Sequence, residues 1–357
     1  MSGLSDYIRE LIEKNGPLSI ARYMELALQH PEYGYYRHHD PLGKSGDFIT
    51  APEISQMFGE MIGLWWADVW HQIDSPSEFI LLELGPGRGT LLEDALRATI
   101  KIKGLHQAMR LYLLESSTAL RSMQSDRLKS HRPKHIDSLS NLPELPTIVL
   151  ANEFFDALPV RQFEKTAHGW CERLVAVEAN RFVFTLSAPD PAFLMMIPEE
   201  RREVNVGAIY EFSMASLSLI RTLASHISRF GGAALIIDYG YAAFAGQGTL
   251  QALAGHNFVD VLSRPGEIDI TAHVDFHALK QIASANEVRV FGPLGQGEFL
   301  KSLGIEVRAI QLKHTASQEH SKEIDQALHR LTDPSQMGSL FKTLGIASQK
   351  QETMAGF

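Results

Sequence analysis

Short apolar runs recur along the chain, and most are followed by a stretch in which apolar residues have helical spacing. The runs that read as buried strands lie at 79–83, 110–115, 135–137, 147–151 and 233–238. Strands that alternate with helices are typical of an α/β fold built on a parallel sheet. We therefore expect the carboxyl ends of these strands to meet at one edge of the sheet, where open α/β folds bind their ligands.

The segments around this core have other patterns. Apolar residues from Leu4 to Ile12 share one helical face, and a second helix can begin after Ser19. A nearly all-apolar helix over 54–70 should be buried. Between 160 and 186 the apolar residues alternate, with turns at His168-Gly169 and Ala179-Asn180, which predicts β-hairpins in a β-rich flap inserted into the core.

The rest of the chain returns to helices and strands. We expect helices over 213–229 and 274–285, a long loop over 239–271, a short strand at 288–291 and a last helix through Leu328. These patterns divide the chain into an N-terminal helical region (1–75), a first part of the core (76–160), the β-rich insertion (161–212) and a second part of the core with C-terminal additions (213–357).

Composition excludes several classes of function. The 357 residues carry a net charge of −9 with no run of lysine or arginine, so nucleic acid is not an expected partner. Cys171 is the single cysteine, which fits a reducing compartment. No stretch reads as a transmembrane helix or as a signal peptide. The simplest interpretation is a cytoplasmic bacterial protein without membrane insertion.

The first strand runs into a glycine turn, in the sequence FILLELGPGRGT over 79–90. The strand, the turn and the following helix start make a cofactor site, because glycines admit close backbone approach and a helix N-terminus offers free N–H groups. The spacing G-x-G-x-G differs from the G-x-G-x-x-G of dinucleotide-binding turns, which makes an NAD dehydrogenase the weakest interpretation. The alternative is a tight turn without a ligand. The candidate cofactor residues here are Glu83, Gly85, Pro86, Gly87, Gly89 and Thr90.

Two further acids follow neighbouring strands. Glu115 ends the second strand, where a carboxylate can accept hydrogen bonds from both ribose hydroxyls of a nucleotide-type cofactor. The alternative is that Glu115 caps the helix that follows Ser116 and Ser117. Asp137 ends the third strand and is a further candidate cofactor residue.

The fourth strand runs into Asn152-Glu153-Phe154-Phe155-Asp156. We expect Asn152, Glu153 and Asp156 to lie beside the reacting atoms, and two close carboxylates suit a guanidinium group. The alternative is that the two acids cap a following helix.

Four more residues are candidates for substrate contacts: Thr50, Glu53, Asp238 and Tyr239. The first two belong to the loop over 46–53, which can close over the site. For Asp238, capping of the next turn is an equal alternative. His38-His39-Asp40 lacks the spacing of metal ligands, so we expect no metal.

Five segments in order resemble the MidA family of S-adenosylmethionine-dependent methyltransferases, which includes a mitochondrial complex I assembly factor of arginine-methylating type. They are GDFITAPEISQMFGEMIGLWW, ELGPGRGT, ANEFFDALPVRQF, IIDYGY and PGEIDITAHVDF. The resemblance implies a Rossmann-like class I methyltransferase sheet, S-adenosylmethionine as cofactor and a protein arginine as acceptor, in bacteria on a respiratory complex subunit. It places the glycine turn at Gly85, Gly87 and Gly89 and the ribose acid at Glu115. By this resemblance Asp137 is the candidate for the adenine amino group. The chain departs from the family pattern at 135–137, which weakens this assignment, and at Gly248, which puts a charged contact in the late loop in doubt.

Two other functions share the cofactor. One is methyl transfer to a small molecule, and the other is an assembly chaperone that binds the cofactor without turnover. The sequence does not identify the target protein, the methylation state of the product or the oligomeric state.

Overall fold

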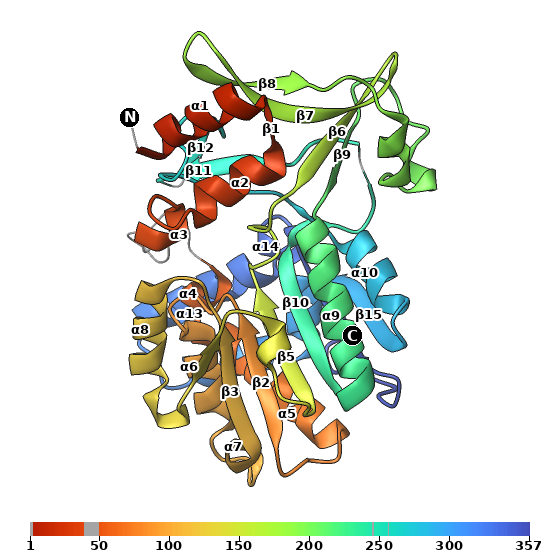
Figure 1. The fold of residues 1–357 in the computed structure, drawn as a ribbon. Helices are drawn as coiled ribbons and strands as arrows, with labels where there is room; N and C mark the ends of the chain where they lie inside the picture. The colour runs from red at the N-terminus through yellow and green to blue at the C-terminus, as the bar shows by residue number, and fades with distance from the viewer. Residues whose placement is uncertain (1–2, 39–49, 245, 256) are drawn as a thin grey trace.

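The computed structural model describes residues 3–38, 50–244, 246–255 and 257–357. The chain forms two lobes that lie one above the other in Figure 1. The lower lobe contains the large sheet with helices on both faces. The upper lobe contains the first helices of the chain and two small sheets. We call it the accessory lobe and define it by α1–α3, β1, β6–β9 and β11–β13.

The large sheet has eight strands in the order β15-β16-β10-β5-β2-β3-β4, with β14 paired to the end of β10. Strands β2 to β5 and β10 run parallel, whereas β16 runs antiparallel to β10 and to β15. The bounds are β2 Phe79–Leu84, β3 Met109–Leu114, β4 Lys134–Ile136, β5 Thr147–Asn152, β10 Gly232–Tyr241, β14 Val274–Asp275, β15 Val288–Gly295 and β16 Phe341–Ser348.

The strand order reverses between β2 and β5. From β2 the chain moves outward to β3 and β4, and it then returns to the other side of β2 with β5. Doubly wound sheets bind their ligands at this reversal point, beyond the carboxyl ends of the strands. The glycine turn after β2 and the acidic segment after β5 both begin there. The predicted Rossmann-like α/β core is therefore confirmed.

Alternating residues of the strands supply two separate cores, as the pleat requires. Leu81, Ile148 and Leu235 face the helices α5 and α6, whereas Ile80, Val149 and Ile236 face α9 and α10. Helix α5 is buried on nearly all sides because it lies between the sheet, α6 and α12, which confirms the buried helix predicted there. The helices of this lobe are α4 Ala51–Ile54, α5 Gln56–Gln72, α6 Thr90–Thr99, α7 Leu105–Ala108, α8 Thr118–Arg127, α9 Met214–Phe230 and α10 Phe276–Ser284, with short 3-10 turns at Lys129–His131 and Leu139–Asn141.

The accessory lobe is assembled from three distant parts of the chain. One core joins Ile8 and Tyr23 of the N-terminal helices to Val175 of the hairpins and to Ala252 and Ile270 of the late strands. The elements are α1 Gly3–Asn15, β1 Leu18–Ser19, α2 Ile20–Gln29, α3 Tyr35–His38, β6 Arg161–Thr166, β7 Gly169–Glu178, β8 Arg181–Leu186, β9 Ile209–Phe212, β11 Gln251–Ala254, β12 Asn257–Val259 and β13 Asp269–Thr271, with 3-10 turns at Pro191–Met195 and Glu199–Arg201. The predicted hairpins are confirmed. The division of the chain into four sequence segments stays a prediction.

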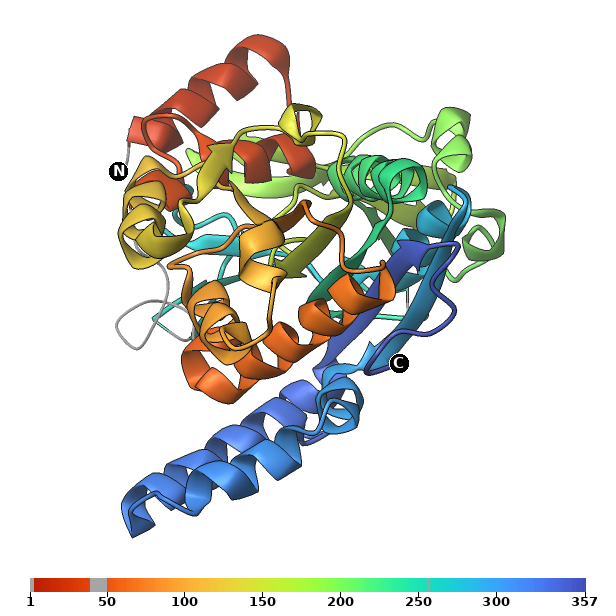
Figure 2. The same cartoon turned by 90° about the horizontal axis from the view of Figure 1, so that it is seen from below.

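One expectation was wrong, and one strand was not predicted. The segment 239–271, expected to be a long loop, contains β11, β12 and the three residues of β13. The strand β16 carried no prediction, although it is buried between β10 and β15. It follows the helices α11 Gln296–Ser302, α12 Ile305–Lys313, α13 Gln318–Thr332 and α14 Met337–Leu340. In Figure 2 these blue helices extend away from the sheet as an arm.

Among the described residues, no helix is both long enough and apolar enough to cross a membrane.

Candidate active site

The glycine turn adopts a backbone that side chains other than glycine rarely allow. Gly85, Gly87 and Gly89 have φ angles of 61°, 53° and 78°, in the left-handed region that favours glycine. A Cβ atom on Gly85 would lie 2.6 Å from the ring of Phe154. Gly89 precedes Thr90, the first residue of α6. The N–H of Gly89 donates to the carbonyl of Pro86 at 2.8 Å. The turn therefore brings the start of α6 and its free N–H groups to the reversal point.

Two adjoining cavities open around this turn. The larger has a volume of about 460 Å³, within the range of small-molecule sites. The smaller has a volume of about 60 Å³. Both are lined by Thr50, Gly85, Gly87 and Glu153.

Glu83 lines the smaller cavity from the end of β2. Its side chain is buried, and among the described residues its Oε2 atom has no hydrogen-bond partner. Burial, and then the nearby Glu115, raise the pKa of Glu83 to about 8. A buried carboxyl group whose oxygen lacks a hydrogen-bond partner costs folding free energy unless a ligand supplies that partner. The position therefore suits a cationic group of the ligand.

Glu115 lines the larger cavity. Its Oε1 accepts a hydrogen bond from the backbone N–H of Ser117 at 2.8 Å, and its Oε2 accepts one from Gln124 at 3.2 Å. Gln124 also donates to the carbonyl of Gly87 at 2.6 Å and bonds to the ring of His135 at 2.9 Å. The buried Gln124 therefore fixes the glycine turn, Glu115 and β4 relative to one another. The sequence carried no signal for it, because a glutamine within a polar helix has no distinguishing pattern.

Asp137 lies at the outer edge of the same cavity, where its side chain is largely exposed and pairs with Arg121. Thr90 and Glu53 contact each other, since the Thr90 hydroxyl donates to Glu53 at 2.6 Å. Thr50 precedes α4 and lines both cavities. Residues 46–49 of the loop expected to close over the site, together with His39 and Asp40, lie outside the described residues.

Glu153 follows β5 with a φ of 50°, a strained conformation for a residue with a side chain. Its Oε1 accepts hydrogen bonds from the N–H of Ala51 at 2.9 Å and from Asn152 at 3.2 Å. Burial raises the pKa of Glu153 to about 7. No helix begins after β5, so the alternative in which these acids cap a helix has no support in the structure.

Asp156 lines the larger cavity and is buried. Its Oδ1 has no hydrogen bond of good geometry among the described residues. The Tyr239 hydroxyl lines the same cavity and, through hydrogen bonding, offsets part of the rise in the pKa of Asp156. Burial raises the pKa of Asp156 to about 6. Asn152 lines the smaller cavity, and its side-chain oxygen is likewise buried without a partner in the described part of the chain.

Asp238 has a different position from the one expected for a substrate contact. It is fully buried and lines neither cavity. Its Oδ2 accepts hydrogen bonds from the N–H groups of Phe154, Phe155 and Asp156 at 3.1, 2.9 and 3.2 Å, and its Oδ1 accepts one from Tyr239 at 2.9 Å. This geometry favours the capping alternative, in which Asp238 shapes the turn that presents Glu153 and Asp156.

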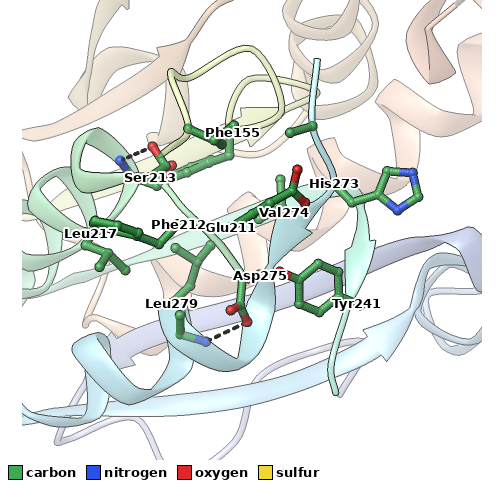
Figure 3. A pocket seen from close by; sticks show the side chains of 14 residues that line it. Phe155, Glu211, Phe212, Ser213, Leu217, Tyr241, His273, Val274, Asp275 and Leu279 are labelled. Atoms are coloured by element: carbon green, nitrogen blue, oxygen red, sulfur yellow. Dashed lines mark hydrogen bonds between the residues drawn. The ribbon is translucent and has the colours of Figure 1, made fainter. Parts of the chain in front are cut away.

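A third pocket, shown in Figure 3, lies between α9, the end of β10 and α10. Phe155 and Leu279 line it together with Asp275, which accepts a hydrogen bond from the N–H of Ala278 at 3.0 Å. Its volume is about 30 Å³, room for about one water molecule. It is too small for a cofactor or an acceptor side chain. In the described part of the chain, no cluster of three or more His, Cys, Asp or Glu is placed to hold a metal ion.

Residues 61–294 match the family described as putative S-adenosyl-L-methionine-dependent methyltransferases. The chain belongs to this family and is an S-adenosylmethionine-dependent methyltransferase. It is 36% identical to a Drosophila melanogaster protein named protein arginine methyltransferase NDUFAF7 homolog, mitochondrial, over 96% of this chain and 84% of the relative. It is 34% identical to the Homo sapiens protein arginine methyltransferase NDUFAF7, over 94% of this chain and 81% of the relative.

A solved structure supports the same conclusion. A Burkholderia thailandensis protein described as a likely methyl transferase, bound to S-adenosyl-homocysteine, superposes with a TM-score of 0.86 at 28% identity. The similarity covers 99% of this chain and 94% of that one. The residues at the glycine turn fit such a cofactor, because they combine an open turn, an unsatisfied buried carboxyl group for an ammonium and a second acid for ribose hydroxyls.

The pKa of Glu83 leads to a prediction for cofactor binding. Below pH 8 the carboxyl group is largely protonated, and an ammonium beside it lowers its pKa. Binding of S-adenosylhomocysteine should therefore release protons near pH 7, and its affinity should rise with pH up to about 8. Calorimetry in two buffers of different ionisation enthalpy measures the release. Glu83→Gln should abolish it, whereas the exposed control Glu78→Gln should not. Equal proton release by Glu83→Gln and the wild type would refute the assignment.

A second prediction concerns Glu115. Loss of its hydrogen bonds to the ribose should weaken S-adenosylhomocysteine binding by about 10- to 100-fold in Glu115→Ala, the effect of losing roughly 1.5–3 kcal/mol. NADH should not bind the wild type appreciably. Titration with each ligand measures both affinities, and tight NADH binding would contradict the cofactor assignment.

Proposed function

We propose that the protein transfers the methyl group of S-adenosylmethionine to an arginine side chain of a protein. The observation that carries this proposal is the pair of acids at the reversal point, whose pKa values are both raised by burial. Glu153 and Asp156 line one cavity with the glycine turn and Glu115. The charge of Asp156 acts on the carboxyl group of Glu153. A cation bound between them would compensate both the cost of removing the carboxylates from water and their mutual repulsion.

The chain's own residues have separate tasks in this reaction. Glu83 and Glu115 orient the amino acid and ribose parts of the cofactor, and Asp137 is the candidate contact for the adenine. When bound, the cofactor supplies an electrophilic methyl group. Glu153 and Asp156 orient the guanidinium so that one nitrogen faces this methyl group, and in-line placement is a large part of catalysis.

A proton must leave the guanidinium nitrogen once it carries the new methyl group. Asp156 is the proposed acceptor of this proton, because its buried Oδ1 forms no hydrogen bond of good geometry among the described residues. A pKa of about 6 keeps Asp156 ionised at neutral pH while it remains an effective base. Tyr239 presents its hydroxyl to the same cavity and is the candidate that orients the acceptor.

The names of the relatives support the choice of arginine and of a protein acceptor, since each is called a protein arginine methyltransferase. We also place this protein in the bacterial cytoplasm, which its single cysteine supports. Thr50 and Glu53, which line the smaller cavity beside the glycine turn, are the proposed further contacts with the substrate.

The proposal predicts that binding and turnover can be separated. Asp156→Asn and Glu153→Gln should reduce methyl transfer to an arginine-containing protein fraction by roughly 10²–10³, the range for losing one preorganised charge partner. S-Adenosylhomocysteine affinity should stay nearly unchanged, most clearly in Asp156→Asn, because Asp156 does not line the cavity beside Glu83. The assay is labelled methyl transfer followed by hydrolysis to methylarginine.

Asp260→Asn is the matched control, since Asp260 is exposed and lines neither cavity. If the two site variants transfer methyl groups at the wild-type rate, the arginine clamp is wrong and a small neutral acceptor is the better interpretation.

A further inference from the structure

One histidine beside the larger cavity has no task in the proposed reaction. His135 lies in the middle of β4, where it pairs with Leu113 of β3, and its side chain is half-buried. It lines neither cavity. The two residues that follow it, Ile136 and Asp137, do line the larger cavity. Any effect of His135 on the cofactor must therefore pass through another residue.

That residue is Gln124, whose amide group has one orientation that its neighbours allow. Its nitrogen lies 2.6 Å from the carbonyl oxygen of Gly87 and 3.2 Å from Oε2 of Glu115. A backbone carbonyl oxygen and an ionised carboxylate only accept hydrogen bonds. The reverse orientation would place the amide oxygen of Gln124 against both acceptors. Its Nε2 therefore faces Gly87 and Glu115, and its Oε1 faces His135.

This orientation determines which nitrogen of His135 carries a proton. The Oε1 atom of Gln124 only accepts hydrogen bonds, and the Nε2 atom of His135 lies 2.9 Å from it. The histidine ring must therefore donate from Nε2. Burial, and then the charge of Arg121, lower the pKa of His135. Near pH 8 the ring is consequently neutral and holds its single proton on Nε2.

We propose that His135 is a positioning residue for the cofactor. Its Nε2–H fixes the amide of Gln124, and this amide holds the Glu115 carboxylate in the orientation that accepts the ribose hydroxyls. The inference rests on the part of the proposed function in which Glu115 contacts the ribose, and it holds for any methyl acceptor.

The remaining contacts of Glu115 show why this support matters. Its Oε1 accepts a hydrogen bond from the N–H of Ser117 at 2.8 Å, so Gln124 holds the other oxygen. The Gln124 side chain is completely buried. If His135 offered no donor, the Oε1 atom of Gln124 would lose this hydrogen bond inside the protein, and the amide would be held at one end only. The carboxylate of Glu115 would then be less well oriented for the ribose.

The test compares S-adenosylhomocysteine affinities of variants of the full chain by calorimetry. His135→Phe keeps a planar ring without a donor and should weaken binding about fivefold, the effect of one hydrogen bond. His135→Gln can place an N–H close to the position of Nε2 and should restore most of the affinity. His226→Phe is the matched control, since His226 is also half-buried, bonds to the Thr147 hydroxyl at 2.9 Å and lines neither cavity. It should bind S-adenosylhomocysteine like the wild type.

Two further measurements distinguish positioning from general support of the fold. In the Glu115→Ala background, His135→Phe should weaken binding by less than about twofold, because His135 acts through Glu115. The ring nitrogens of His135, observed by ¹⁵N NMR and assigned by their loss in His135→Phe, should show the proton on Nε2 near pH 8.

The outcomes distinguish this inference from the assignment on which it rests. If Glu115→Ala binds S-adenosylhomocysteine as tightly as the wild type, the ribose contact of Glu115 is wrong and the inference falls with it. If Glu115→Ala weakens binding and His135→Phe does not, only the inference is wrong. A proton on Nδ1, or equal losses from His135→Phe in both backgrounds, would contradict it as well. Should His135→Phe not fold, Gln124→Met removes the same contact from the side of α8, and unchanged affinity there would overturn the inference.

Discussion

The carboxylate of Asp238 is the point on which the geometry of the site depends. It lies at the end of β10, fully buried, and accepts hydrogen bonds from the N–H groups of Phe154, Phe155, Asp156 and Tyr239. Three of these N–H groups belong to the turn after β5. The turn belongs to no helix or strand, so its N–H groups have no partner in regular structure and donate to the side chain of Asp238 instead.

This bonding explains how a strained residue is maintained beside the cavity. Glu153 has a left-handed backbone conformation, which costs free energy for any residue with a side chain. The N–H groups that follow it are held by Asp238, and its own N–H donates to the carbonyl of Ile237 at 2.9 Å. The turn can therefore direct Asp156 into the larger cavity while Glu153 reaches both cavities. Tyr239, bonded to the same carboxylate through its backbone, places its hydroxyl beside them.

Much of this arrangement could be predicted from the sequence because it depends on local signals. The glycine spacing after β2, the acids at the ends of β2 and β3 and the Asn-Glu-Phe-Phe-Asp segment after β5 are all contiguous motifs. The carboxyl ends of parallel strands lie at one edge of the sheet, which is why these motifs lie together. Gln124 escaped prediction, as did Tyr36 of α3 and Asp269 of β13, which line the larger cavity. The positions of all three depend on how distant segments pack. The strand β16 escaped it because its place between β10 and β15 is decided by tertiary pairing alone.

The central claim is that burial keeps the pKa of the Asp156 carboxyl group raised in the free protein and that a cationic acceptor compensates this carboxylate when it binds. The side-chain carboxyl carbon of Asp156, observed by ¹³C NMR and assigned by its loss in Asp156→Asn, measures this directly. The account predicts titration near pH 6 in the free protein and a lower pKa once an arginine peptide is bound. A pKa at or below the ordinary value of about 4 in the free protein would contradict it, because such a carboxylate would already be satisfied by the protein itself.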